Sequence, residues 1–84
     1  MSRPTEVTLL TQTDCSSCDA AKEILARVGR EYPLQLCEID LATAEGQRLA
    51  TSAGVLFAPG VLLEGEAFSY GRLSERRLRR ALER

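Results

Sequence analysis

Residues 7–28 read VTLLTQTDCSSCDAAKEILARV, and this stretch decides the fold. The apolar block at 7–10 is typical of a strand buried on both faces. Farther on, apolar residues at 20, 21, 24, 25 and 28 recur at the spacing of three and four that marks one face of a helix. The sequence therefore predicts a strand over 7–12 and a helix over 16–30 with Thr13 or Asp14 as N-cap. The CSSC motif lies at their junction.

The two cysteines of this motif, Cys15 and Cys18, are separated by two residues, so their sulfurs can close a disulfide across the first helical turn. Unpaired N–H groups and the helix dipole favour a thiolate on the first cysteine. We therefore expect Cys15 to be the nucleophile of thiol–disulfide exchange and Cys18 the resolving thiol. Because like charges repel, the carboxylate of Asp14 disfavours that thiolate and is expected to tune the pKa of Cys15. The chain has no histidine, so Cys–His hydrolysis lacks a usual component.

Length and composition limit the class of protein. With 84 residues, 44% of them hydrophobic and 27% charged, the chain fits one globular domain over 1–84 with a single small core. No segment approaches the ~20 apolar residues that span a bilayer, and residues 1–6 lack the apolar core of a secretory signal. Three cysteines are odd in number and too few for a disulfide scaffold. We expect a cytoplasmic protein that contacts no membrane.

The charges are unevenly placed along the chain. Up to residue 71 there are five basic against ten acidic residues, whereas residues 72–84 hold six arginines and two glutamates. A basic helix can bind nucleic acid, but no aromatic residues are interleaved with these arginines. We interpret the segment as a solvated helix face and expect no nucleic-acid partner.

Cap, break and turn residues delimit the rest of the chain. They predict a strand over 34–40, a short helix over 43–54, strands over 60–63 and 67–70, and a helix from residue 74. The first two strands with the helix between them form a βαβ unit, whose right-handed crossover makes the strands parallel. Pro59 cannot lie inside a regular central strand, so the third strand is expected to begin after it. The predicted order is βαβαββα.

An α/β chain of this order, with CxxC at the end of the first strand and Pro59 just before the hairpin, resembles the thioredoxin fold in its minimal glutaredoxin form. Residues 54–66 (GVLFAPGVLLEGE) are similar to the stretch around the family's cis-proline. Residues 70–74 (YGRLS) resemble its closing turn into the last helix. The resemblance covers nearly the whole chain and points to a small bacterial glutaredoxin-like family. It implies a mixed four-stranded sheet with helices on both faces.

The resemblance also carries a substrate site. It implies that the Ala58–Pro59 peptide is cis and lies opposite the reactive sulfur. The backbone of Ala58 would then pair with an extended substrate segment and hold its disulfide in line with Cys15. The expected substrate-binding residues are Ala58, Pro59, Ser16 and Ser17.

Departures from the family pattern limit what is expected of the partners. Ser16-Ser17 replaces the Gly-Pro of thioredoxins and the Pro-Tyr of many glutaredoxins, the chain has no tryptophan, and Gly71 stands alone where glutathione-dependent members have a pair of glycines. These departures argue against glutathione binding, while the reducing partner stays open between glutathione and a thioredoxin-reductase-type enzyme. We expect no bound cofactor or metal beyond the redox-active Cys15–Cys18 disulfide. The expected partners are a disulfide-containing protein or a low-molecular-weight thiol substrate, and an external reductant. The expected oligomeric state is a monomer.

The leading function is a thiol–disulfide oxidoreductase that reduces protein or small mixed disulfides through Cys15 and Cys18. One alternative is a thioredoxin-fold protein-binding module without turnover, and another is a metal or cluster carrier. Cys37 lies on a strand with alternating neighbours and is interpreted as a small buried hydrophobe. A third redox thiol, an intermolecular disulfide and a zinc site shared with the CSSC cysteines stay open for Cys37.

Three further side chains near the expected site have two interpretations each. Phe57 and Tyr70 are expected to pack in the core or at its rim, and the alternative is an apolar wall of the site. Arg72 is expected to be solvated, and the alternative is a contact with a substrate carboxylate.

Overall fold

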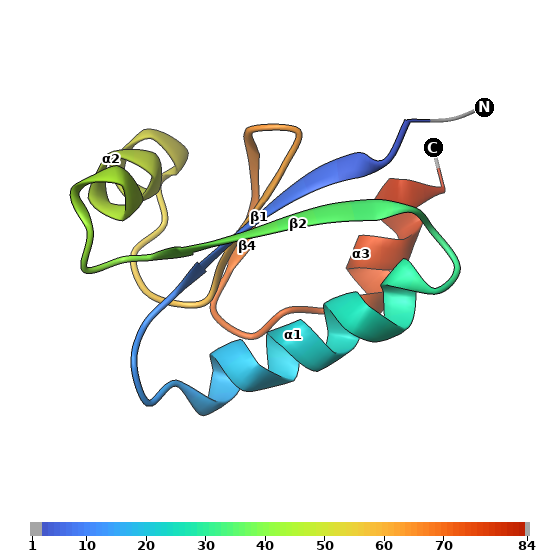
Figure 1. Cartoon of the computed structure of the whole chain (residues 1–84), viewed down its shortest axis with the longest axis horizontal. Helices are drawn as coiled ribbons and strands as arrows, with labels where there is room; N and C mark the ends of the chain where they lie inside the picture. The colour runs from blue at the N-terminus through green and yellow to red at the C-terminus, as the bar shows by residue number, and fades with distance from the viewer. Residues whose placement is uncertain (1–2, 84) are drawn as a thin grey trace.

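β1 (Thr5–Thr11) runs through the middle of the protein in the computed structural model, which describes residues 3–83 (Figure 1). The elements that follow it are α1 (Ser16–Gly29), β2 (Leu34–Asp40), α2 (Ala44–Ala53), β3 (Gly60–Leu63), β4 (Glu66–Tyr70) and α3 (Glu75–Leu82). The predicted order βαβαββα is confirmed. Among the helices of residues 3–83, none is long and apolar enough to cross a membrane.

The strands form one mixed sheet in the order β2-β1-β3-β4. β1 pairs in parallel with β2 without interruption, from Thr5 opposite Leu34 to Thr11 opposite Asp40. On its other side β1 pairs antiparallel with β3, and β4 completes the hairpin with a register shift next to Val61. The two edges of the sheet are therefore a long regular strand, β2, and a short irregular one, β4.

The larger core lies between the sheet and the pair α1 and α3 (Figure 1). Side chains from β1, α1, β3, α3 and the segment leading into α3 fill it, and they are Val7, Leu9, Ala21, Leu25, Val28, Val61, Leu73 and Leu78. Alternate residues of a strand point to opposite faces, so Leu10 contributes to a second core on the other side. The expectation of a first strand buried on both faces is confirmed.

The second core is small because α2 covers only one end of its face. α2 is held at the carboxyl end of β2, where a Cβ on Gly46 would collide with the carbonyl of Asp40. Gln47 Nε2 also donates to the Leu41 carbonyl at 2.5 Å. From this position α2 covers Ile39 and Leu10, and the earlier part of β2 has no helix over it.

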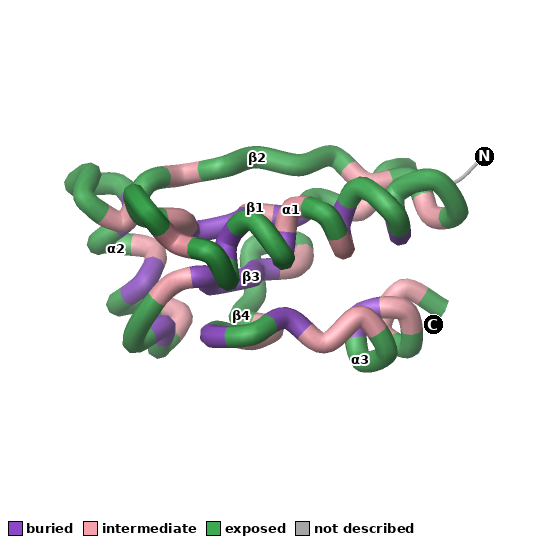
Figure 2. The backbone as a smooth tube through the Cα atoms, turned by 90° about the horizontal axis from the view of Figure 1, so that it is seen from below, coloured by how far each residue is buried: buried purple, intermediate pink, exposed green. Residues whose placement is uncertain are grey.

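This placement overturns the interpretation of Cys37 as a buried side chain. Cys37 is exposed, and the burial interpretation is wrong. The cause is the strand order, since β2 is an edge strand and α2 begins beyond its carboxyl end. In Figure 2 the middle of β2 is a continuous exposed stretch along the border of the molecule.

Local signals set the caps and turns elsewhere. Thr43 Oγ1 accepts the N–H of Gly46 at 3.0 Å, and Ser74 Oγ accepts the N–H of Arg77 at 3.2 Å, so both predicted N-caps are confirmed. Glu64 and Gly65 join β3 to β4 with φ of 52° and 82°. Two left-handed residues match the twist of a tight hairpin.

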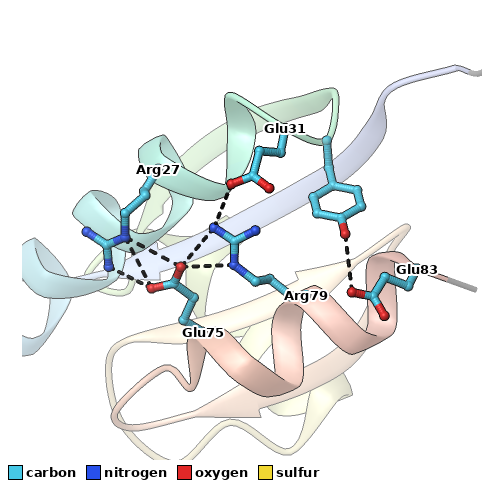
Figure 3. A network of polar contacts seen from close by, with 6 residues as sticks. Arg27, Glu31, Glu75, Arg79 and Glu83 are labelled. Atoms are coloured by element: carbon cyan, nitrogen blue, oxygen red, sulfur yellow. Dashed lines mark hydrogen bonds and ion pairs between the residues drawn. The ribbon is translucent and has the colours of Figure 1, made fainter.

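A network of ion pairs joins α1 to α3 at the far end of α1 (Figure 3). Arg27 Nη2 donates to Glu75 Oε1 at 2.7 Å, and Arg79 Nη2 lies 3.0 Å from both Glu75 Oε2 and Glu31 Oε2. Hydrogen bonds from Arg27, and then those from Arg79, hold the pKa of Glu75 below its usual value. Beside this network, burial and the neighbouring Glu83 raise the pKa of Tyr32.

Candidate redox site

The CSSC motif begins α1 through an unusual cap. Cys15 has an extended backbone (φ −115°, ψ 100°), and its Sγ accepts the N–H of Cys18 at 3.1 Å. Cys15 is therefore the N-cap, and the prediction of Thr13 or Asp14 is wrong. The chain turns one residue earlier, at Asp14, whose φ of 55° is in the left-handed region that Asp tolerates. Asp14 is exposed and adjoins the site without capping it.

Cys15 and Cys18 form a disulfide, with their Cα atoms 5.2 Å apart. The two sulfur-bearing residues differ in access to solvent, because Cys15 is half-buried whereas Cys18 is only 2% exposed. Cys18, in the first turn of α1, is therefore enclosed by protein, whereas Cys15 is partly open to solvent. The roles of attacking and resolving thiol stay predictions, and this difference in access favours Cys15 as the attacking one.

The Pro59 loop meets the same end of the sheet. Gly60, the first residue of β3, pairs with Leu10 near the end of β1, from which the chain runs into the CSSC motif (Figure 1). The Ala58–Pro59 peptide is cis, and Pro59 is buried. Its carbonyl accepts the N–H of Gly71 at 2.8 Å, which fixes the loop to the segment that leads into α3.

Ala58, the residue expected to pair with substrate, keeps its backbone available. It is half-buried, and within residues 3–83 its N–H and C=O take part in no hydrogen bond. An unpaired backbone group at a partly buried position favours a partner that supplies the missing bond.

A hollow of about 330 Å³ adjoins the CSSC turn. Ser16, Ser17 and Arg72 supply its polar lining. Its apolar lining consists of Ala20, Ala21, Ile24 and Leu73. Ser16 and Ser17, two of the predicted substrate-binding residues, thus share this hollow with the exposed guanidinium of Arg72. A contact between Arg72 and substrate was only the alternative interpretation from the sequence.

Exposed apolar side chains surround the Pro59 loop. Phe57 and Tyr70 are 57% and 41% exposed, which excludes the core for both and leaves the rim or the apolar wall of the site. Their rings meet edge to face, with centroids 5.1 Å apart and planes at 88°. The nearest atom to a Cβ built on Gly71 belongs to the Phe57 ring, at 3.1 Å, so the pair borders the segment that carries Arg72.

Leu56 was missed by the sequence analysis. It is 77% exposed and precedes Phe57 in the loop. The available signal was an apolar Leu56-Phe57 pair outside any expected strand, separated from Pro59 by one residue, where burial is not expected.

Within residues 3–83 no three His, Cys, Asp or Glu side chains lie together in a way that could hold a metal ion.

The comparisons with known proteins agree with this geometry. The family described as Glutaredoxin-like domain (DUF836) matches residues 6–83, nearly the full chain. The chain belongs to this glutaredoxin-like family. A relative in Mycobacterium tuberculosis (strain ATCC 25618 / H37Rv), the uncharacterized protein Rv0508, is 34% identical over all of this chain and 88% of its own length. The uncharacterized protein Mb0520 of Mycobacterium bovis matches to the same extent.

Solved structures place this glutaredoxin-like chain in the thioredoxin fold. The thioredoxin-like protein BC3987 superposes with a TM-score of 0.73 and 26% identity, over 90% of this chain and 99% of that one. A single-residue variant of thioredoxin from Halobacterium salinarum NRC-1 gives a TM-score of 0.72 at 21% identity, over 96% of this chain and 74% of that one. At that identity the second likeness concerns the fold alone. The predicted thioredoxin-like α/β class is confirmed.

Proposed function

We propose that this protein is a dithiol–disulfide oxidoreductase that reduces disulfides of proteins or small molecules. The observation that carries the proposal is the asymmetric CSSC pair at the start of α1. Cys15 is reachable from solvent and accepts the N–H of Cys18, whereas Cys18 is 2% exposed. A backbone N–H aimed at a sulfur stabilises the thiolate over the thiol.

The reaction takes two exchange steps. The thiolate of Cys15 attacks one sulfur of the substrate disulfide, a mixed disulfide forms, and the other substrate sulfur leaves as a thiolate. Cys18 then loses its proton and attacks the Cys15 sulfur, which releases the second substrate thiolate and leaves the Cys15–Cys18 disulfide. The substrate gains two electrons and two protons, and an external dithiol returns the protein to its reduced form.

Two surfaces beside Cys15 support binding of an extended substrate. The unpaired backbone of Ala58 offers a donor and an acceptor to a substrate strand. The exposed Leu56 and Phe57 next to it favour apolar substrate side chains. On the other side, the hollow with Ser16, Ser17 and Arg72 accommodates a short polar or anionic group.

The proposal is tested with an insulin-type disulfide reduction assay in the presence of a dithiol reductant. The wild type should exceed the rate of the dithiol alone, and Cys15→Ser should return to it. Cys37→Ser is the matched control, since it removes an exposed thiol outside the CSSC motif. If the wild type is no faster than the dithiol alone, the proposed activity is wrong.

Trapping identifies the substrate. Cys18→Ser removes the resolving thiol, so the mixed disulfide on Cys15 should accumulate and can be isolated without reductant. A partner that stays bound when both CSSC cysteines are replaced by serine would instead favour the binding module without turnover.

A further inference from the structure

We propose that β2 is a pairing edge for a second copy of this chain, with the two β2 strands antiparallel about a two-fold axis at Cys37. The proposal goes beyond the redox function and does not depend on it. It starts from the contrast between the two sheet edges. β4 is short and its register shifts against β3, whereas β2 is in register with β1 over its whole length. Long, regular, exposed edges are templates for strand addition.

The hydrogen-bond direction on β2 decides which residues face outward. The N–H of Thr5 donates to the Pro33 carbonyl at 3.0 Å, and the N–H of Leu41 donates to the Thr11 carbonyl at 2.8 Å. Bonding residues alternate along a parallel strand, so the odd-numbered positions 33–41 bond to β1. The even-numbered positions 34, 36, 38 and 40 direct their N–H and C=O groups to the outside.

This pattern is self-complementary about Cys37, the central residue of β2. Antiparallel pairing centred there places Leu36 opposite Glu38 of the second copy, and both positions carry outward groups. The Asp40 carbonyl already accepts the N–H of Thr43, so only its N–H remains for Leu34 of the second copy. The seam then has about six backbone hydrogen bonds, four from the pairs of 36 with 38 and two from the pairs of 40 with 34.

Cys37 lies at a non-hydrogen-bonded position of this seam. At such positions opposite Cα atoms are about 4.5 Å apart, which is within the range of about 4.4–6.8 Å that a disulfide spans. Cys37 is exposed, and the two copies of it face each other on the side of the sheet that α2 leaves uncovered. No other cysteine of the chain can meet its own copy across this edge, since Cys37 alone lies on β2.

The side chains along β2 do not protect the edge. Charged residues usually guard exposed edges, but Glu38 is paired with Lys22 at 3.3 Å and Asp40 Oδ1 accepts the N–H of Ala42 at 2.8 Å. Leu36 is 43% exposed and lies next to the axis, where it can reach its own copy diagonally. Figure 2 shows β2 as the outermost element on its side, so no helix blocks a second sheet.

Cross-linking tests the position of the axis in a Cys15→Ser/Cys18→Ser background, with oxidised glutathione as the oxidant. One Cys37 thiolate attacks glutathione disulfide and releases one glutathione, and the second Cys37 attacks the mixed disulfide and releases another. A covalent dimer should form. With Cys37→Ser added, Gln35→Cys should cross-link at least about tenfold more slowly than Cys37, because Gln35 is exposed on the same strand but its two copies lie four positions apart along the seam. Equal cross-linking through Cys37 and through Gln35→Cys would overturn the proposal.

The non-covalent pair is tested on the reduced wild type by sedimentation equilibrium over a concentration series. Leu36→Glu puts a carboxylate opposite Glu38 twice per dimer and should raise the dimer Kd by about tenfold. Leu56→Glu is the matched control, because it makes the same change at an exposed leucine outside β2 and should leave the Kd unchanged. A monomer at every concentration, or equal effects of the two variants, overturns the proposal. If Leu36→Glu fails to fold, the comparison of Cys37 with Gln35→Cys in cross-linking decides.

Discussion

The two ends of α1 are stabilised in different ways. At the N-terminal end, the N–H of Cys18 donates to the sulfur of Cys15, a half-buried residue that a substrate can reach. At the C-terminal end, Arg27 and Glu31 are tied to α3 through Glu75 and Arg79 (Figure 3). Between them lies a helix face buried in the larger core. The comparison indicates that one end of a single helix can stay open for chemistry while the other end fixes the helix in place.

The largest expected effect is on catalysis at the N-terminal end of α1, the end that is open to substrate. Cys15→Ser should lower disulfide reductase turnover by about a thousandfold or more, because a hydroxyl does not replace the thiolate nucleophile. Glu75→Gln, at the fixed end, should leave turnover within about twofold, since distant sites act independently. Steady-state kinetics on both variants makes the comparison. A large loss of turnover in Glu75→Gln would mean that the two ends are coupled.

The next effect concerns the buried face that joins the two ends. Leu25 is 2% exposed, so Leu25→Ala removes apolar contacts and leaves a cavity in the larger core. The free energy of unfolding should fall by about 2 to 5 kcal/mol, as measured by urea denaturation. Lys22→Ala is the control, because it alters an exposed side chain of the same helix and should lower the free energy of unfolding far less. Ala26→Gly would not serve, since it changes helix propensity. Equal losses in the two variants would contradict the assigned core.

Much of this arrangement could be predicted from the sequence, because it depends on neighbours along the chain. Thr43 and Ser74 cap their helices through side-chain oxygens, and Gly54 ends α2 with a φ of 72°. The cap of α1 was missed for an equally local reason. Sulfur is a weak acceptor and is not among the usual capping groups, so Thr13 and Asp14 were favoured over Cys15.

What could not be predicted depends on strand order and helix placement. An alternating strand is consistent with burial on one face, but whether a helix covers Cys37 depends on α2, which Gly46 holds against Asp40 at the far end of β2. The exposure of Phe57 and Tyr70 has a similar cause. Both were expected in the core or at its rim, and a loop and an edge strand carry them to the surface.

A smaller effect is expected at the Pro59 loop, where the proposed substrate surface includes Phe57. Phe57→Ala removes an exposed ring beside the Pro59 loop and should raise the KM for a protein disulfide by about fivefold. The KM for a small aliphatic disulfide should change little, since such a substrate has no large side chain to pack on the Phe57 ring. Phe68→Ala is not a matched control, as Phe68 packs against the larger core. Tyr70→Phe, which keeps the edge-to-face pair, should behave like the wild type. Equal changes in KM for both substrates would remove Phe57 from the binding surface.

The smallest expected effect is a pH dependence of the melting temperature, caused by the ion pairs that fix the C-terminal end of α1. Hydrogen bonds from Arg27 and Arg79 lower the pKa of Glu75 from its usual value of 4.5. A carboxyl whose pKa is lower in the folded state contributes stability above its unfolded pKa and loses that contribution as the pH falls through the folded pKa. Glu75→Gln should therefore lower the melting temperature slightly at neutral pH and have no effect in strong acid.

Circular dichroism melts from pH 7 down to pH 2 measure this difference between wild type and Glu75→Gln. High salt should also reduce it, because the pairs are partly exposed and are screened. Glu66→Gln, which removes an exposed carboxylate on β4, serves as the charge-matched control and should show no such convergence in acid. If the melting temperatures of Glu75→Gln and the wild type differ equally at every pH, the network does not hold the C-terminal end of α1 through charge. Packing between α1 and α3 would then be sufficient to fix that end.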